Sequence, residues 1–162
     1  MQEVTFILGA NLSNKEEVIN LAISFLEWNI GALMSKSSLY ESPAWGYEST
    51  NDYLNQVVVF KSELAPEVIL EKAMRIEKVL GRKRESEGYA DRVIDIDILT
   101  IEAQIINTEN LIVPHPRLHL RRFCLLPLAE VKPDWEHPIL KQTVSEMISN
   151  CTDTGVLTKR TN

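Results

Sequence analysis

Apolar and polar residues are arranged along the chain in two patterns, one typical of strands and one typical of helices. Short apolar runs bounded by turn residues predict strands, and apolar residues three or four positions apart predict amphipathic helices. The strands are expected at residues 4–8, 35–42, 54–61 and 94–98, and the helices at 13–30, 66–80, 123–131 and 143–150. Ser13 and Glu16 predict a capping box at the first helix, and Gly81 predicts the end of the second.

The order of the first six elements, β-α-β-β-α-β, is that of a ferredoxin-like α+β fold, in which an antiparallel sheet carries helices on one face. Additional helices after residue 116 are expected to cover more of the sheet. A chain of 162 residues fits one domain with its own core, so we expect a single domain over residues 1–162. The tail after Cys151 has little to hold it and is expected to be loosely attached.

The strand at residues 94–98 alternates between isoleucine and aspartate without a break. A period of two predicts a strand with one buried face, so the three isoleucines are expected in the core and Asp95 and Asp97 on the opposite face. Two carboxylates roughly 6.5–7 Å apart at their roots repel each other unless a cation or a proton lies between them. Hard oxygen ligands at this spacing suit Mg²⁺, although the same pattern also occurs on ordinary solvated strands.

A basic loop precedes this strand and carries the opposite charge. Guanidinium groups bind phosphate oxygens through two hydrogen bonds at once. Arg82, Arg84 and Arg92 of this loop, together with Arg121 later in the chain, are therefore candidates to bind phosphate. Acidic residues beside a basic loop are expected where metal-bound polyphosphate is handled. The polar, glycine-containing segment 81–92 has few apolar residues to bury, and we predict that it is a mobile lid.

Composition and charge narrow the classes of function. The net charge of −6 argues against a general nucleic-acid binder, and no apolar run approaches the ~20 residues that span a bilayer. Cys124 and Cys151 form no metal-type or disulfide pattern, and no basic leader precedes an apolar run at the start. We therefore expect a cytoplasmic protein, monomeric, without nucleic-acid or membrane partners. The glycine-rich phosphate motifs of P-loop and Rossmann proteins are absent from the sequence.

Several blocks of sequence, in order from about residue 4 to about residue 148, resemble the 6-hydroxymethyl-7,8-dihydropterin pyrophosphokinase family. The blocks are Gly9-Ala-Asn11, Tyr40-Glu-Ser42-Pro43, Asp52-Tyr53-Leu-Asn55, Arg92-Val-Ile-Asp95-Ile-Asp97-Ile-Leu, Val113-Pro-His115-Pro, Arg121-Arg-Phe123 and Pro127-Leu-Ala-Glu130. The resemblance implies an enzyme of folate biosynthesis that transfers pyrophosphate from ATP to the hydroxymethyl group of the pterin and releases AMP.

The resemblance also implies roles for individual residues. It implies that Asp95 and Asp97 bind two Mg²⁺ ions, and that they act in catalysis with Arg82 and Arg92. The pterin ring would lie between Tyr53 and Phe123, and its edge would bind Asn55 and the chain around Ser42, Pro43, Ala44 and Trp45. The co-substrate ATP would contact Glu77, Arg82, Arg84, Arg92, Ile98, Leu111, Ile112, His115 and Arg121.

Some positions depart from the family, and two other classes of function stay open. Ala90-Asp91, Pro116 and Met74 stand where many members have other residues, so contacts to ATP at these positions are open. A two-metal phosphohydrolase could use the same aspartates with water as the nucleophile. A non-catalytic ferredoxin-like binding module could share the fold without the chemistry.

Overall fold

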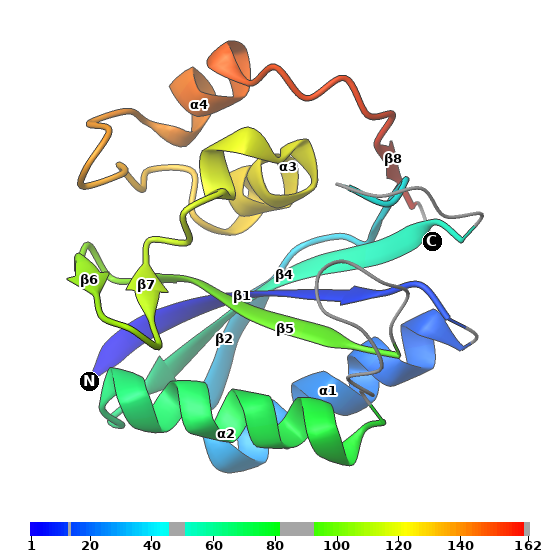
Figure 1. Cartoon of the computed structure of the whole chain (residues 1–162), viewed down its shortest axis with the longest axis vertical. Coiled ribbons are helices and arrows are strands. Elements are labelled where there is room, and N and C mark those ends of the chain that lie inside the picture. Colours follow the sequence, from blue (N-terminus) through cyan, green and yellow to red (C-terminus); the bar gives the residue numbers. More distant parts are fainter. Residues whose placement is uncertain (13, 46–50, 82–92, 161–162) are drawn as a thin grey trace.

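The computed structural model describes residues 1–12, 14–45, 51–81 and 93–160, and Figure 1 shows a central sheet between two layers of helices. The strands are β1 (Gln2–Ala10), β2 (Ala32–Lys36), β3 (Tyr40–Ser42), β4 (Tyr53–Ser62), β5 (Asp95–Ile101), β6 (Ile106–Asn107), β7 (Ile112–Val113) and β8 (Thr158–Lys159). The helices are α1 (Lys15–Asn29), α2 (Pro66–Val79), α3 (Arg122–Val131) and α4 (Val144–Asn150), with a 3₁₀ turn at Leu118–Leu120.

The main sheet has the strand order of a ferredoxin-like fold. The order is β5-β1-β4-β3-β8, with β2 also paired to β4, and every pairing is antiparallel. Helices α1 and α2 lie on one face, and α3 and α4 lie on the other (Figure 1). This arrangement confirms the predicted α+β class, and α3 and α4 are the additional helices expected to cover more of the sheet.

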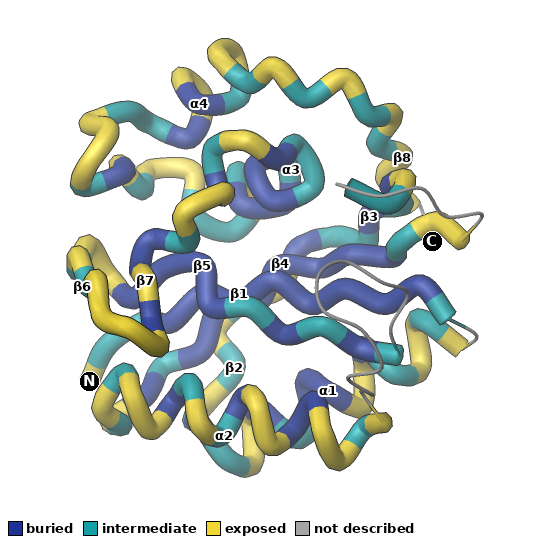
Figure 2. The backbone as a smooth tube through the Cα atoms, viewed as in Figure 1, coloured by how far each residue is buried: buried dark blue, intermediate teal, exposed yellow. Residues whose placement is uncertain are grey.

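Two layers of apolar side chains, one on each face of the sheet, form the core. Under α1 and α2, Phe6 and Phe60 meet edge to face with ring centroids 5.9 Å apart. The three isoleucines of β5 and its flank belong to the same layer, as predicted, with exposures of 0% for Ile94, 6% for Ile96 and 5% for Ile98. The second layer packs residues such as Val57 of β4 against α3 and α4. Figure 2 shows the buried sheet and the exposed outer sides of α1 and α2.

The prediction of one continuous strand at residues 35–42 was wrong. The structure has two strands there, β2 and β3, with a break at residues 37–39. At the break the hydroxyl of Ser37 accepts a hydrogen bond from the backbone N–H of Val57 at 3.0 Å. The side chain of Gln56 donates to the carbonyl of Ser37 at 2.7 Å. Side chains thus replace part of the regular ladder, and the chain shifts between the two strands.

The C-terminal tail is held more firmly than predicted. Strand β8 pairs with β3, and Arg160 forms ion pairs with Glu41 at 3.0 Å and Glu16 at 3.1 Å. The side chain of Glu16 is therefore engaged by the tail, and α1 begins at Lys15 without a side-chain cap. Ser13, the predicted cap, lies outside the described residues. None of the helices in the described ranges is long and apolar enough to cross a membrane.

Candidate active site

A cavity of about 470 Å³ is lined by Ile7 and Phe123 among others, and so lies on the face of the sheet that carries α3. Ten residues of its lining were predicted as site residues: Ser42, Pro43, Trp45, Tyr53, Asn55, Asp95, Asp97, His115, Arg121 and Phe123. The fold thus brings together side chains from β3, β4, β5, α3 and the loop after β7. Four more lining residues were not predicted to lie in the site: Ile7, Gly9, Pro116 and Arg117.

Three neighbouring strands form the floor of the cavity. Gly9 of β1 pairs with Asp95 of β5 on one side and with Asn55 of β4 on the other, so the three residues form one row across the sheet. A Cβ atom on Gly9 would lie 3.3 Å from Oδ1 of Asn55 and 3.4 Å from the ring of Tyr53. The absence of a side chain at Gly9 therefore leaves the floor open between a carboxylate and an amide.

The carboxylates of Asp95 and Asp97 in the cavity lining form a cluster with the carboxylate of Glu77. Glu77, Asp95 and Asp97 have carboxylate oxygens within 4.8 Å of one another. Glu77 belongs to α2, is 3% exposed, and accepts a hydrogen bond of 2.6 Å from the backbone N–H of Ile96, between the two aspartates. Such a set of hard oxygen donors suits a divalent cation. The sequence had suggested Glu77 only as a contact to ATP, and the structure places it with the acidic pair.

The amide of Asn55 is oriented by two hydrogen bonds. Its Nδ2 donates to Oγ of Ser42 at 2.8 Å and to the carbonyl oxygen of Tyr40 at 3.3 Å. Because the nitrogen faces β3, the oxygen Oδ1 lies over Gly9 at the floor of the cavity. Asn55 is 2% exposed, so this orientation is fixed within the protein. The cavity therefore presents a hydrogen-bond acceptor at this point.

Aromatic rings hold one of the predicted phosphate-binding arginines. The guanidinium carbon of Arg121 lies 4.6 Å from the ring centroid of Trp45 and 5.5 Å from that of Phe123. Arg121 is only 7% exposed, and cation–π contacts are strongest where water is excluded. Arg117 also approaches Trp45, at 5.9 Å. Packing against these two rings therefore holds the guanidinium group of Arg121 at the cavity.

His115 is a neutral hydrogen-bonding group that lines the cavity together with Asp97 and Arg121. Burial, with a smaller effect from the charge of Arg121, lowers the pKa of His115 to about 4, and the charge of Asp95 opposes this shift. Nδ1 accepts a hydrogen bond from the backbone N–H of Arg117 at 3.1 Å. The proton of the neutral ring therefore lies on Nε2, which can donate to a ligand.

A second cavity of about 250 Å³ adjoins the first. It is lined by Leu70, Ile96, Asp97, Ile98, Glu109, Asn110, Leu111, Ile112, His115 and Pro116. The two cavities share Asp97, His115 and Pro116. The predicted ATP contacts Ile98, Leu111 and Ile112 meet here, whereas Leu70, Glu109 and Asn110 were not predicted. These three residues reach the cavity because of how α2 and the hairpin β6–β7 pack, and no local sequence pattern indicates this packing.

Some predicted residues lie elsewhere. Ala44 lines a smaller cavity of about 120 Å³ beside the first, together with Pro43 and Trp45. Arg82, Arg84 and Arg92 lie outside the described residues, as does the predicted lid at 81–92 except for Gly81, whose φ of +105° after the end of α2 confirms the helix end predicted there.

The two adjoining cavities share the carboxylate of Asp97, an arrangement with room for two ligands side by side. The chain matches the model of one family, 7,8-dihydro-6-hydroxymethylpterin-pyrophosphokinase (HPPK), over residues 5–133. The chain therefore belongs to the HPPK family and is a pyrophosphokinase, an enzyme of pyrophosphoryl transfer to hydroxymethyldihydropterin.

Individual relatives agree with this family. The chain is 40% identical over 141 residues to the 2-amino-4-hydroxy-6-hydroxymethyldihydropteridine pyrophosphokinase of Porphyromonas gingivalis, covering 85% of this chain and 95% of the relative. The Aquifex aeolicus enzyme of the same name is 39% identical over 146 residues, 90% of each chain. The fold resembles the crystal structure of wild-type Plasmodium falciparum HPPK-DHPS with a TM-score of 0.74 and 17% identity, over 92% of this chain and 44% of that one.

Proposed function

We propose that the protein transfers the pyrophosphoryl group of ATP to the hydroxymethyl group of 6-hydroxymethyl-7,8-dihydropterin and releases AMP. The observation that carries the proposal is the junction of the two cavities at Asp97 and His115, where Asp97 is one of three clustered carboxylates. A transfer between two substrates needs one site for each, with their reacting ends close together. The larger cavity is assigned to the pterin and the smaller one to the nucleoside part of ATP.

The larger cavity has the chemistry that a pterin requires. A pterin is flat and carries hydrogen-bonding groups along its rim, so it needs aromatic faces and a few fixed polar partners. Tyr53 and Phe123 supply the rings, and Oδ1 of Asn55 can accept from a ring N–H or the exocyclic amino group. The backbone of residues 42–45 is proposed to bind the remaining edge.

The smaller cavity suits the adenine and ribose. Ile98, Leu111 and Ile112 offer apolar contacts, and His115 lies where the nucleotide would extend toward the first cavity. The Nε2–H of His115 and the guanidinium of Arg121 are proposed to bind phosphate oxygens as charge develops there. Arg82, Arg84 and Arg92 are proposed as further phosphate ligands.

Asp95 and Asp97 are proposed to hold two Mg²⁺ ions, with Glu77 behind them. The three clustered carboxylates fit such ions, because Mg²⁺ prefers one or two carboxylates together with phosphate oxygens. Bound metal would neutralise phosphate charge and lower the pKa of the substrate hydroxyl. The backbone N–H of Ile96 donates to the carboxylate of Glu77 and fixes its position, so this negative charge stays close to Asp95 and Asp97.

The reaction that follows is an in-line displacement at the β-phosphorus. The hydroxymethyl oxygen forms a bond to this phosphorus, and the bond to the oxygen that bridges the α- and β-phosphorus atoms breaks. AMP leaves with that oxygen and its electron pair, and the hydroxyl proton goes to solvent. The chain itself positions the two substrates and stabilises the charge through Arg121 and His115.

The test is incubation with ATP, Mg²⁺ and 6-hydroxymethyl-7,8-dihydropterin, with AMP measured by chromatography. We expect AMP to form in proportion to pyrophosphorylated pterin, and only when the pterin is present. Asp97→Asn is expected to lower kcat/KM by about 100-fold or more, whereas the control Asp134→Asn, at an exposed position, leaves it unchanged. Phosphate or pyrophosphate release without pterin would favour a phosphohydrolase, and tight binding without any turnover would favour a binding module.

A further inference from the structure

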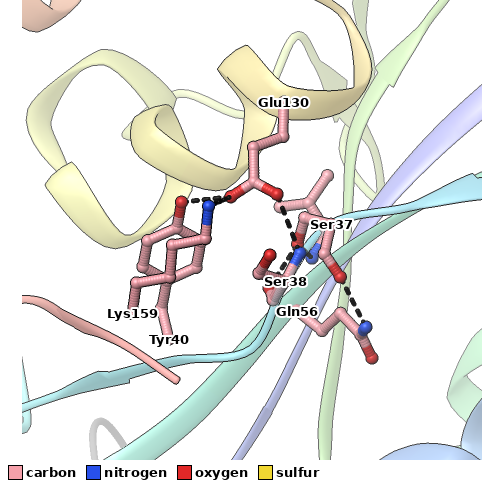
Figure 3. A network of polar contacts seen from close by, with 7 residues as sticks. Ser37, Ser38, Tyr40, Gln56, Glu130 and Lys159 are labelled. Atoms are coloured by element: carbon pink, nitrogen blue, oxygen red, sulfur yellow. Dashed lines mark hydrogen bonds and ion pairs between the residues drawn. The ribbon is translucent and has the colours of Figure 1, made fainter. Parts of the chain in front are cut away.

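A carboxylate of α3 connects that helix to the strand beside the larger cavity. One oxygen of Glu130 accepts the phenol proton of Tyr40, and the other accepts the backbone N–H of Ser38 at 3.0 Å. The ammonium group of Lys159 in β8 lies 3.8 Å from the first of these oxygens. Figure 3 shows Glu130 pointing down from its helix toward all three partners.

The partners of Glu130 are next to the groups that orient Asn55. The carbonyl oxygen of Tyr40 and the hydroxyl of Ser42 accept the two hydrogen bonds from Nδ2 of Asn55. These hydrogen bonds direct Oδ1 toward the cavity floor. A shift of β3 by a fraction of an ångström would lengthen both, and the amide would be free to turn. The position of β3 therefore determines the acceptor that the cavity offers.

Strand β3 needs an external anchor because it is short. It has three residues, from Tyr40 to Ser42, and the break at residues 37–39 separates it from β2. Its pairing with β4 covers only these three positions, and its other neighbour, β8, has two residues. Glu130 holds both the break, through Ser38, and the start of the strand, through Tyr40.

Glu130 is suited to this role by its charge. Burial acts to raise the pKa of Glu130, but the hydrogen bonds from Tyr40 and Ser38 and the charge of Lys159 outweigh it, so the net shift is downward. Burial, with the hydrogen bond to Glu130 and its charge, also raises the pKa of Tyr40 above its usual range, which keeps the phenol proton in place. An ionised carboxylate accepts both hydrogen bonds at once, and charged acceptors make the stronger bonds.

We propose that Glu130 is a positioning residue for pterin binding, acting through Tyr40 and Ser38 on β3 and hence on the amide of Asn55. This inference rests on the proposed function, because it assumes that Oδ1 of Asn55 accepts a hydrogen bond from the pterin. It requires no contact between Glu130 and either substrate. It predicts that the loss of Glu130 affects the pterin far more than the nucleotide.

The experiment is a double-mutant cycle on ligand affinity, with Glu130→Ala, Asn55→Ala and the double variant. The probe is 6-hydroxymethylpterin, titrated by calorimetry in the presence of Mg²⁺ and a saturating non-hydrolysable ATP analogue. Each single variant is expected to weaken pterin binding about 10-fold, since a misplaced buried hydrogen bond costs about 1.4 kcal/mol. The double variant is expected to lose about 10-fold as well, and not 100-fold, because both changes remove the same interaction. The dissociation constant of the ATP analogue is expected to change by less than about 2-fold.

Two further variants separate positioning from general stability. Glu130→Gln keeps an oxygen that can accept the N–H of Ser38 but loses the charge and the second acceptor, so it is expected to restore only part of the affinity that Glu130→Ala loses. Glu41→Gln is the matched control, because Glu41 lies in the same strand and pairs with Arg160, away from Asn55. It is expected to leave pterin affinity unchanged. If Glu130→Ala does not fold, Tyr40→Phe removes only the hydroxyl and is expected to weaken pterin binding about 3-fold.

The outcomes also separate this inference from the proposed function. Additive losses in the cycle, equal weakening of pterin and nucleotide, or an equal effect of Glu41→Gln would overturn the positioning role while leaving the proposed function intact. A wild-type protein that binds no pterin, or an Asn55→Ala variant that binds it normally, would contradict the pterin assignment itself, and the inference would fall with it.

Discussion

Replacing Glu77 by glutamine is expected to stabilise the metal-free protein and to reduce its response to Mg²⁺. The carboxylate oxygens of Glu77, Asp95 and Asp97 lie within 4.8 Å of one another. At an effective dielectric constant of about 20, each pair of charges at that distance repels by about 3.5 kcal/mol. The substitution removes two of the three repulsions and retains an oxygen that can accept the N–H of Ile96.

Solvent and the other partners of these three carboxylates reduce the net effect, and Asp95 and Asp97 are only half-buried. We expect a net gain of about 1–2 kcal/mol without metal, which raises the melting temperature by roughly 3–6 °C for a domain of this size. In the wild type, a site with a dissociation constant of about 1 mM would add about 1.4 kcal/mol at about 10 mM Mg²⁺. A tenfold weaker site would add only about 0.4 kcal/mol.

The assay is thermal unfolding followed by calorimetry, with and without MgCl₂. The matched control is Glu71→Gln, on the same helix, where the carboxylate is exposed and pairs with Arg75 at 3.3 Å. We expect the control to show the wild-type response to Mg²⁺. If Glu77→Gln lowers the melting temperature of the metal-free protein, or keeps the full Mg²⁺ response, then Glu77 takes no part in an electrostatic cluster with the aspartates.

Three other predictions follow from the geometry. Gly9→Val places side-chain atoms against Oδ1 of Asn55, so pterin affinity should fall by about 10-fold or more while nucleotide affinity, measured by titration, stays within about 2-fold; equal loss of both would contradict the assignment of the floor. His115 has a folded-state pKa of about 4, below its ordinary 6.5, so the unfolded chain binds the extra proton between these values. Stability should therefore fall as pH drops from 6.5 toward 4, by at most about 3 kcal/mol, and His115→Gln should flatten this part of a denaturation–pH curve. Arg160→Ala removes two exposed ion pairs and should cost no more than about 1 kcal/mol in urea unfolding, with the largest rise in hydrogen exchange in β8; a larger loss would show that the tail contributes more to stability than its contacts indicate.

The sequence predicted the structure correctly where a local pattern of residues determines the local conformation. The alternation at residues 94–98 persists in β5, because the isoleucines face the core under α1 and α2 while the aspartates face the cavity. Gly81 ends α2 as predicted, because a φ of +105° favours glycine. The aromatic and polar residues of the larger cavity were identified by their resemblance to a family, since no single one of them carries a distinctive local signal.

The features that were missed depend on contacts between distant segments. The break at Ser37 arises from hydrogen bonds with β4, about twenty residues away in the chain. Glu77 joins the aspartates only because α2 packs beside the edge strand β5, and the helical pattern around it predicts no more than burial. The pairing of β8 with β3 joins the end of the chain to its first third. Such pairings follow from tertiary packing, which overrides local propensity.

The most direct test of the central claim is a crystal structure with Mg²⁺, a non-hydrolysable ATP analogue and 6-hydroxymethylpterin bound together. The account predicts the pterin over Gly9 and beside Asn55, and the nucleoside against Ile98 and Leu111. It also predicts metal ions on Asp95 and Asp97, between the phosphates and the pterin hydroxyl. A structure in which both ligands are bound and these two carboxylates coordinate nothing would contradict it.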